Sequence, residues 1–267
     1  MIWLVGCGNM AGAMLHGWLD AGVAAERFTV VRPSGVEPAP GVRTLATLPV
    51  GEPAPAIVML GVKPVKIDDV TPALAPLLAP KTVLISILAG VEIASLRARM
   101  PVPSAVVRAM PNLPVRLRAG VTGLFADGPD AAGRAEITDL MALLGIAEWV
   151  DDEAALDAVS VLAGSGPAFV YRFIDALAVA GAEIGLDAAQ ARRLALGTVE
   201  GAAMLAAEAN ASPAVLADRV ASPGGSTRKG LDVLDEEKAL QRLLSRTLAA
   251  SRRRVAEMAA EARGPNS

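Results

Sequence analysis

Short apolar runs that end at glycine, proline or polar residues recur through the first 150 residues of the chain. The first of these runs, IWLV, is followed directly by Gly6. Apolar runs of this length, bounded by turn residues, are typical of buried strands. We therefore expect strands at residues 2–5, 28–31, 57–60, 83–87, 105–107, 120–125 and 146–150.

Segments with helical spacing of their apolar positions lie between these runs. We expect helices at residues 9–21, 65–78, 93–100 and 130–144. Strands and helices that alternate with short links are typical of a parallel sheet covered by helices on both faces. Residues 37–55 are rich in Pro and Gly, and their structure is poorly defined from sequence. The pattern thus predicts an α/β domain over residues 1–150.

After residue 150 the strand-like runs stop and long Ala- and Leu-rich segments follow. Asp187 and Gln190 have the spacing of a capping box, and Ser212 precedes Pro213 as a good N-cap does. The helix expected at about 187–209 is apolar over most of its circumference, which is typical of a buried helix. A helical domain this small offers little cover, so we expect an all-helical C-terminal dimerisation domain over residues 151–267.

Charge and composition exclude several classes of function. The chain carries 25 Lys and Arg against 28 Asp and Glu, a net charge of −3. This balance argues against nucleic acid as a partner, because nucleic-acid-binding surfaces carry an excess of basic residues. Cys7 is the only cysteine and His16 the only histidine. We therefore expect no disulfide and no protein metal site, and the single thiol fits a reducing cytoplasm.

The most apolar segment lies between Asp157 and Arg172. A membrane-spanning helix needs about 20 consecutive apolar residues. This segment is shorter, and the sequence Gly-Ser-Gly-Pro interrupts it at residues 164–167. We therefore expect a soluble, cytoplasmic protein without a membrane span.

The segment GCGNMA after the first strand matches the dinucleotide-binding pattern G-x-G-x-x-G/A. In this pattern Gly6 permits a tight turn, Gly8 lets the backbone approach a pyrophosphate, and Ala11 allows the helix to pack closely on the strand. The helix that opens at Asn9 and Met10 presents oriented amides to the phosphates. A glycine turn without a ligand is the alternative. The strand before the motif and the helix after it favour a Rossmann-type domain that binds a nicotinamide dinucleotide.

The end of the second strand discriminates between NAD and NADP. An Asp or Glu there binds the adenine ribose 2′-hydroxyl of NAD. This chain has Arg32 and Ser34 instead, and no carboxylate. Both residues suit a 2′-phosphate through charge-assisted hydrogen bonds. The alternative is a solvated arginine in a loop. We expect NADPH, with NADH as the second choice.

The acceptor of the hydride is indicated by what the second domain lacks. Hydroxy-acid dehydrogenases use a His or Lys at the alcohol oxygen. A related group with this two-domain layout carries its Lys in the stretch that corresponds to residues 164–171, where this chain has none. A C=N acceptor requires less help, since a protonated imine is already electrophilic. The residues therefore favour imine reduction over ketone reduction.

Six motifs occur in an order that resembles the pyrroline-5-carboxylate reductase family, which makes proline. They are GCGNMA at residues 6–11, VKP at 62–64, SILAG at 86–90, RAMPN at 108–112, GSGPA at 164–168 and VASPGGST at 220–227. The resemblance runs from the first strand to the last helix, and SPGGST is its most specific element.

The resemblance implies reduction of 1-pyrroline-5-carboxylate to L-proline with NADPH or NADH. It also implies that Val62, Lys63 and Ala89 flank the ribose and nicotinamide of the cofactor. Lys63 and Pro64 follow a strand end, where open parallel sheets bind their ligands.

The residues Gly224, Gly225, Ser226 and Thr227 form a glycine turn that feeds a helix-compatible segment. Such a turn presents backbone amides to an anion, here the substrate carboxylate. The resemblance implies that the Thr227 hydroxyl orients the ring nitrogen and relays its proton. The alternative for Ser226 and Thr227 is an ordinary N-cap. By the same resemblance we expect Ser165 and Gly166 to line the substrate pocket, although a plain helix start is the alternative.

The resemblance also implies assembly from dimers whose helical domains interlock, often into decamers. Two other functions remain open at this point. One is an NADP-dependent reductase of another cyclic imine or of a 3-hydroxy acid. The other is a non-catalytic dinucleotide-sensing protein, which has no use for a turn that holds a substrate carboxylate.

Overall fold

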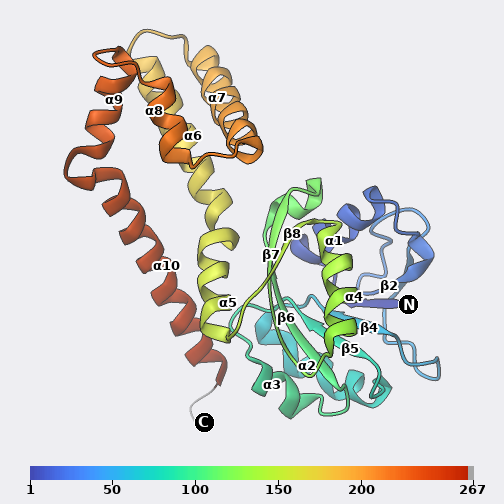
Figure 1. Ribbon diagram of the computed structural model, residues 1–267. Coiled ribbons are helices and arrows are strands. Elements are labelled where there is room, and N and C mark those ends of the chain that lie inside the picture. The colour runs from blue at the N-terminus through green and yellow to red at the C-terminus, as the bar shows by residue number, and fades with distance from the viewer. Residues whose placement is uncertain (264–267) are drawn as a thin grey trace. The chain divides into compact units, whose positions relative to one another are not determined.

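The computed structural model describes residues 1–263, and the chain divides into two compact units (Figure 1). The first unit contains residues 1–167 together with the C-terminal part of the chain from residue 251 onward. The second unit contains residues 168–250. The expected domain boundary between residues 150 and 151 stays a prediction. The last four residues of the expected second domain, 264–267, lie outside the described residues.

An eight-stranded sheet forms the centre of the first unit, in the order β3-β2-β1-β4-β5-β6-β7-β8. The strands are β1 (Ile2–Val5), β2 (Phe28–Val31), β3 (Arg43–Leu45), β4 (Ile57–Leu60), β5 (Val83–Ser86), β6 (Ala105–Pro111), β7 (Gly120–Asp127) and β8 (Gly145–Trp149). The first six strands are parallel and have the order of a Rossmann-type sheet, which confirms the predicted fold class.

Two features of the sheet differ from the sequence-based expectation. β6 and β7 pair in antiparallel fashion, because the link over residues 112–119 is too short for the crossover that parallel neighbours require. β3 lies in the stretch that was poorly defined from sequence, and it pairs with β2 at the sheet edge. Its three residues have a weak local signal, so the strand forms through pairing with its neighbour.

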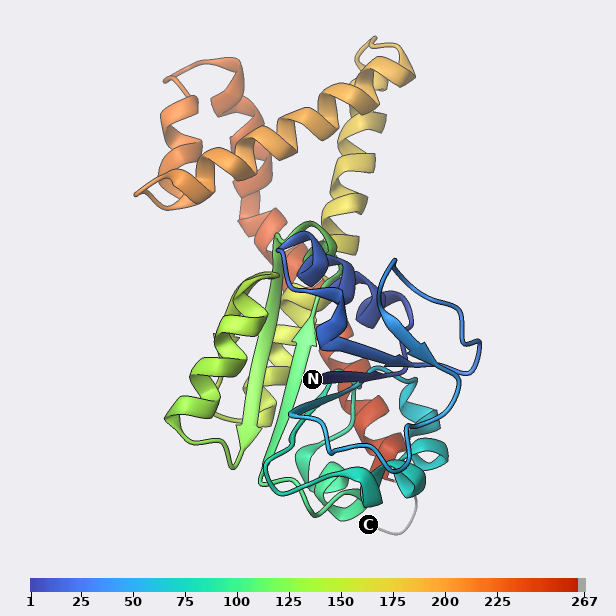
Figure 2. The ribbon, with the colours of Figure 1, turned by 90° about the vertical axis from the view of Figure 1, so that its right-hand side faces the viewer.

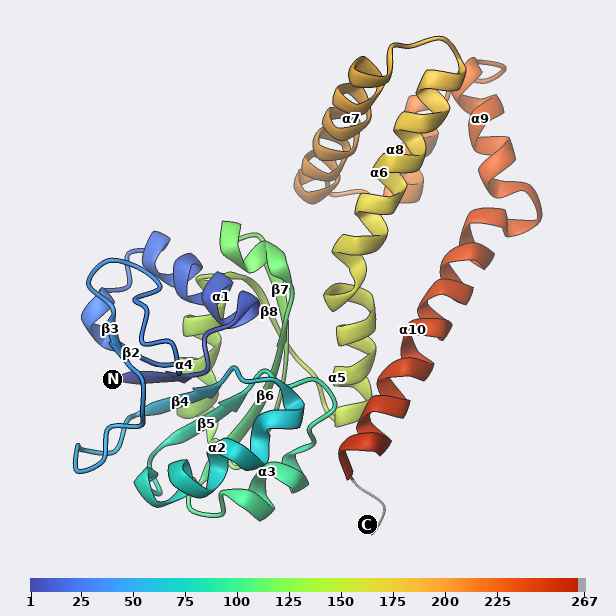
Figure 3. The same ribbon diagram turned by 180° about the vertical axis from the view of Figure 1, so that it is seen from behind.

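Helices cover both faces of the sheet. α1 (Asn9–Asp20) and α4 (Ala131–Ala142) pack on one face, and α2 (Ile67–Leu74) and α3 (Ile93–Arg99) pack on the other (Figures 1 and 3). The side chains of β1 point alternately into the cores on the two faces of the sheet. Ile2 and Leu4 join the core with α1 and α4, and Trp3 and Val5 join the core with α2 and α3. The sequence-based expectation of a sheet covered on both faces is therefore confirmed.

A continuous helical run covers residues Glu153–Glu183. It consists of α5 (Glu153–Val159), a π-helical turn (Ser160–Gly164) and α6 (Gly166–Glu183). The expectation that this apolar segment is too short to span a membrane is wrong, because the Gly-Ser-Gly-Pro sequence does not end the helix. By length and composition alone the run is long enough, and 11% of its most apolar window is buried in the single chain.

Within residues 168–250 the second unit contains helices and no strand (Figure 2). Besides parts of α6 and α10 (Ala239–Arg263) it contains α7 (Ala188–Glu208), α8 (Pro213–Val220) and α9 (Ser226–Asp235). The predicted caps are confirmed: Asp187 accepts the N–H of Gln190 (3.1 Å), and Ser212 accepts that of Val215 (3.4 Å).

Few side chains of the second unit are buried in the single chain. On α7 only Ala191 and Ala195 are buried among the described residues, whereas Leu194 and Leu205 are exposed. The expectation that α7 is buried is therefore not met within one chain. Its apolar surface is available to a partner.

Candidate cofactor and substrate site

The glycine turn after β1 is packed directly against the end of β4. Gly6 has φ +86°, and a Cβ there would lie 2.7 Å from the backbone nitrogen of Val62. A Cβ on Gly61 would lie 2.7 Å from the Gly6 carbonyl oxygen and 2.8 Å from the Cβ of Ala11. Ala11 is itself buried. Residues without bulk at these positions allow the turn, the strand and the helix to approach closely, as the glycine motif predicts.

The start of α1 is open to an anion. Gly8 and Asn9 are exposed, and among the described residues no side chain caps the helix and none in its first turn is acidic. The first amides of a helix have no internal partner, and the helix dipole is positive at this end. The residues present therefore fit a pyrophosphate at Gly8, Asn9 and Met10.

An open depression of about 530 Å³ adjoins this helix start. It is lined by Cys7, Gly8, Asn9, Gly12, Ala13, His16, Arg32, Pro38 and Arg116. Arg32 and Arg116 give it positive charge, although Arg116 also pairs with Asp20. A cationic depression beside free helix amides is suited to a phosphorylated ligand.

Arg32 lines this depression, whereas Ser34 is not among its described lining residues. The Arg32 N–H donates to the carbonyl oxygen of Leu45 (2.9 Å), and its carbonyl accepts the N–H of Gly35 (2.9 Å). Ser34 is exposed, and its Oγ accepts the N–H of Val36 (3.3 Å). The turn after β2 is thus fixed by backbone bonds, which leaves the Arg32 side chain free to bind.

Cys7 and His16 belong to the same surface. Burial raises the pKa of the Cys7 thiol, and the charge of Arg32 opposes this shift only in part. The thiol is therefore neutral near pH 7, in agreement with a small turn residue and not a nucleophile. His16 was assigned no site role, but it lines the depression with Asn9 and Gly12. Positions 9, 12 and 16 lie on one face of a helix, and this spacing could have indicated from the sequence that His16 lies on the same surface as Asn9.

Val62, Lys63 and Pro64 follow β4, next to the glycine turn. β1 and β4 are parallel and in register, with Val5 opposite Leu60, so their carboxyl ends meet at one edge. Lys63 is exposed, and its carbonyl accepts the N–H of Lys66 (2.8 Å) in the short helical turn that Pro64 begins. This edge is where ligands of open α/β sheets bind.

A small cavity of about 20 Å³ lies beside the loop after β5. It is lined by Ala89, Gly90, Arg108, Met110, Asp157, Ser160 and Val255. Ala89 is exposed, whereas Gly90 is buried and has φ +74°. The loop thus turns sharply next to a buried charge.

That charge is Arg108, which is 1% exposed. Its Nη1 donates to Oε1 of Glu153 (2.8 Å), and its Nη2 lies 3.6 Å from Asp157. The same Glu153 oxygen accepts the N–H of Ile93 at the start of α3 (2.9 Å). Burial raises the pKa of the Asp157 carboxyl, while the charge of Arg108 opposes the shift. Motif residue Arg108 therefore ties β6, α3 and α5 together, a role that the sequence did not indicate.

Asn112, at the end of the RAMPN motif, bridges the sheet and the π-helical turn. Its Nδ2 donates to the carbonyl oxygen of Ala163 (3.0 Å), and its Oδ1 accepts the N–H of Val121 (2.8 Å). Pro167 has no N–H, so it cannot bond the carbonyl four residues earlier, which is that of Ala163. Asn112 supplies the missing donor. This explains why a proline is tolerated inside the helical run.

Ser165 and Gly166 lie directly after the π-helical turn. The Ser165 N–H donates to the carbonyl oxygen of Ser160 (3.2 Å), a bond between residues five apart that is typical of a π turn. The Ser165 and Ser251 hydroxyls lie 3.3 Å apart. A Cβ on Gly166 would meet nothing within 4 Å among the described residues. Space is therefore available beside this turn.

The glycine turn of the second unit precedes α9. Gly224 has φ +73°, and the Gly225 N–H donates to the Ser222 carbonyl oxygen (3.0 Å). A Cβ on Gly225 would lie 2.5 Å from the Ser222 Oγ. Ser226 and Thr227 are exposed, and no described side chain caps the helix that begins there. These open amides form a second anion-binding geometry in the chain.

Matches to known families cover most of the sequence. Residues 153–258 match the family described as pyrroline-5-carboxylate reductase dimerisation. Residues 1–90 match the family described as NADP oxidoreductase, coenzyme F420-dependent.

Curated relatives align over almost the whole chain. Pyrroline-5-carboxylate reductase of Pseudomonas aeruginosa is 38% identical over 261 residues, which cover 96% of this chain and 95% of the relative. Pyrroline-5-carboxylate reductase 2 of Bacillus subtilis is 31% identical over 249 residues, which cover 89% of this chain and 87% of the relative.

Solved structures agree. The pyrroline-5-carboxylate reductase of Coxiella burnetii superposes with a TM-score of 0.89 at 33% identity, covering 96% of this chain and 97% of the other. The pyrroline carboxylate reductase of Plasmodium falciparum, solved with NADP bound, has a TM-score of 0.83 at 24% identity, covers 97% of both chains, and supports the fold alone. The resemblance predicted from the six motifs is confirmed, and the chain belongs to the pyrroline-5-carboxylate reductase family.

Proposed function

We propose that this chain reduces 1-pyrroline-5-carboxylate to L-proline with NADPH. The observation that carries the proposal is a pair of uncapped, glycine-preceded helix starts, at α1 and α9. They occur in a chain that is 38% identical to a pyrroline-5-carboxylate reductase over 96% of its length. One helix start suits the pyrophosphate of a dinucleotide and the other suits a carboxylate.

The first unit holds the cofactor. Gly6, Gly8, Asn9, Met10 and Ala11 form the pyrophosphate turn, and Arg32 with Ser34 receives the 2′-phosphate. The residues Val62, Lys63, Pro64 and Ala89 flank the ribose and nicotinamide. When bound, NADPH supplies a hydride to the carbon of the substrate C=N bond.

The second glycine turn holds the substrate. The turn at Gly224 and Gly225 presents the backbone amides of Gly224 and Ser226 to the carboxylate, and Ser165 and Gly166 line the pocket. The Thr227 hydroxyl hydrogen-bonds the ring nitrogen, orients the C=N bond and relays the proton of the nitrogen. Each turnover adds one hydride to the carbon and one proton to the nitrogen of the C=N bond, which converts the imine into an amine. The reaction does not require a lysine as the acid. A protonated imine is electrophilic enough to accept the hydride.

The protein functions as a homo-oligomer, a homodimer at least, in the cytoplasm. The family match over residues 153–258 supports this, because it is to a dimerisation region. The exposed leucines of α7 supply apolar surface for a second copy. Contact with a second copy also explains why the helical run at residues 153–183 exposes apolar side chains without crossing a membrane. The division into domains over residues 1–150 and 151–267, and the absence of a nucleic-acid partner, belong to the same proposal.

A spectrophotometric assay that follows NADPH, consumed by the imines and formed from NADP by the hydroxy acid, tests the proposed reaction. The substrates are pyrroline-5-carboxylate, the six-membered cyclic imine and 3-hydroxyisobutyrate, the last with NADP. We expect turnover with the five-membered imine well above the other two. Preference for the larger ring or for the hydroxy acid would support the alternative reductases. Binding of NADPH without turnover of any substrate would support a sensor.

Replacing Arg32 with aspartate is expected to shift preference from NADPH to NADH. Hydrogen bonds to charged groups contribute about 1.5–3 kcal/mol, so the ratio of the two kcat/KM values should change by roughly tenfold or more. Aspartate also repels the 2′-phosphate and accepts the 2′-hydroxyl of NADH. The readout is kcat/KM for each cofactor, with NADPH affinity measured separately by fluorescence.

Arg27→Asp is the matched control, because Arg27 is exposed and lies just before β2, at the opposite end from Arg32. It makes the same change of charge away from the depression. An equal shift of cofactor preference in both variants would mean that only the net charge of the protein matters. An unchanged preference in Arg32→Asp would place the Arg32 side chain outside the cofactor site.

A further inference from the structure

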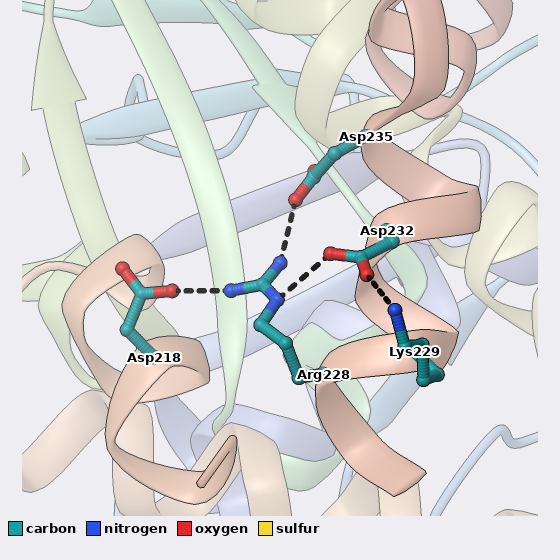
Figure 4. Close-up of polar contacts among 5 residues, drawn as sticks. All are labelled: Asp218, Arg228, Lys229, Asp232 and Asp235. Atoms are coloured by element: carbon teal, nitrogen blue, oxygen red, sulfur yellow. Dashed lines mark hydrogen bonds and ion pairs between the residues drawn. The ribbon is translucent and has the colours of Figure 1, made fainter. Parts of the chain in front are cut away.

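Arg228 lies directly after the Ser226–Thr227 pair and contacts three carboxylates (Figure 4). Its Nη1 lies 3.0 Å from Asp218 on α8, its Nε 3.0 Å from Asp232, and its Nη2 3.1 Å from Asp235 on α9. The arginine side chain is 29% exposed, whereas each of the three carboxylates is more than half exposed. Three nitrogens of one guanidinium are thus each engaged by a different carboxylate.

These carboxylates are unfavourably placed without a cation. Asp218 is in the last turn of α8, and Asp235 is the last residue of α9. The C-terminal end of a helix carries partial negative charge, so acidic residues there are disfavoured. Lys229 offers a weaker contact, at 3.6 Å from Asp232. Arg228 is therefore the main neutralising group of the cluster.

The contacts of Arg228 also join two helices across the glycine turn. Asp218 precedes the turn and Arg228 follows it, so the ion pair closes a loop that contains Gly224 and Gly225. Inside this loop the Gly225 N–H donates to the Ser222 carbonyl oxygen (3.0 Å). A planar guanidinium with several fixed donors is suited to hold two helix ends in one geometry.

We infer that Arg228 is a positioning residue for the substrate carboxylate. It fixes α8 and α9 on either side of the glycine turn and neutralises the three carboxylates beside the amides that receive the anion. The inference rests on the proposed function, in which the turn at Gly224 and Gly225 presents the amides of Gly224 and Ser226 to that carboxylate. Arg228 is not itself the ligand, because each of its nitrogens already faces a protein carboxylate.

The net charge of this cluster predicts the direction in which KM for the imine changes when Arg228 is removed. Arg228 and Lys229 with the three aspartates sum to −1, and removal of Arg228 leaves −2 beside a site for an anion. The extra repulsion acts on the incoming substrate more than on the hydride step. KM for the imine should therefore rise more than kcat falls, and the rise should shrink as salt screens the charges.

The test compares Arg228→Gln with Arg242→Gln in the full-length protein. Arg242 is an exposed arginine of α10 in the same unit and pairs with a single carboxylate, Glu237, at 3.2 Å. We expect Arg228→Gln to raise KM for pyrroline-5-carboxylate roughly threefold to fivefold, in line with one exposed charge interaction. In contrast, kcat and KM for NADPH should stay within about twofold. Arg242→Gln should change none of these values.

Two further measurements separate charge from packing. Raising the salt from about 0.05 M to about 0.5 M should narrow the KM gap, since the Debye length falls well below 10 Å. Arg228→Lys, and Arg228→Gln combined with Asp235→Asn, restore the local charge and should recover most of the KM. Circular dichroism and gel filtration check that each variant is folded. Should Arg228→Gln not fold, Asp235→Asn carries the test: it removes one negative charge while Arg228 stays in place, so KM for the imine should fall, and an unchanged KM would overturn the inference.

The outcomes are distinguishable. Inactivity of the unaltered protein toward pyrroline-5-carboxylate overturns the proposed function and this inference with it. An active protein in which Arg228→Gln and Arg242→Gln have the same KM overturns the inference alone. A KM gap that salt and charge restoration leave unchanged also overturns it, because Arg228 would then act only in packing.

Discussion

Thr227→Ala is expected to lower kcat for pyrroline-5-carboxylate by roughly 10²-fold while leaving NADPH affinity within about a factor of two. Proton transfer by a positioned side chain contributes about 10²–10⁴-fold to catalysis, and the Thr227 hydroxyl is the group that we place on the ring nitrogen. The residue is exposed in the first turn of α9, after the glycine turn, so its hydroxyl is accessible to a ligand. Steady-state kinetics and fluorescence titration with NADPH measure the two effects.

Two neighbouring variants control for side effects of the change. Thr227→Ser keeps a hydroxyl and should retain most of the turnover. Ser226→Ala removes the adjacent hydroxyl but keeps its backbone amide, which is the group that we assign to the carboxylate, so it should have little effect. Unchanged turnover in Thr227→Ala would remove the role of Thr227, and an equal loss in Ser226→Ala would assign it to the turn as a whole.

Asn112→Leu is expected to lower the free energy of unfolding by about 2–4 kcal/mol. Asn112 is 6% exposed, and its side chain serves both the Ala163 carbonyl and the Val121 N–H. Leucine has a similar size but leaves both backbone groups without their partner. Each buried unsatisfied group costs about 1–3 kcal/mol. Urea denaturation followed by tryptophan fluorescence reports the change, because Trp3 and Trp18 are buried in the two cores of the first unit.

Asn210→Leu makes the same substitution at an exposed residue between α7 and α8. It should change the unfolding free energy by no more than about 0.5 kcal/mol. Similar stability of both variants would mean that Asn112 does not hold the π-helical turn. Loss of activity in Asn112→Leu at full stability would place its effect on Ser165 and Gly166 instead.

The sequence was sufficient to predict the features that depend on local pattern. The run Ile2–Val5 followed by Gly6 predicted both a central strand and the turn after it, because an apolar run and a glycine are local signals. The caps at Asp187 and Ser212 were predictable for the same reason, since a cap is a contact between residues two or three apart. The role of Arg32 was inferred from its place at a strand end and stays a prediction, although the structure places Arg32 at the depression beside α1.

Features that depend on distant partners were not predictable in this way. β6 and β7 contain good strand residues, but nothing local in them encodes antiparallel pairing. Asn112 and Ala163 are 51 residues apart, and the reason for their hydrogen bond lies in Pro167. Arg108 is a conventional surface residue by type, and its burial against Glu153 emerges only when the sheet and α5 are in place.

The first unit is assembled from two separate stretches of chain, and this affects its synthesis on the ribosome. The sheet and α5 can form once residue 167 has emerged. Ser251, beside Ser165, and Val255, at the cavity near Arg108, are translated only after the whole second unit. At about 5–20 residues per second, the intervening segment takes on the order of ten seconds to make. During that delay the nascent chain carries an uncovered helix surface, so the first unit closes only after residues 251–255 have been made.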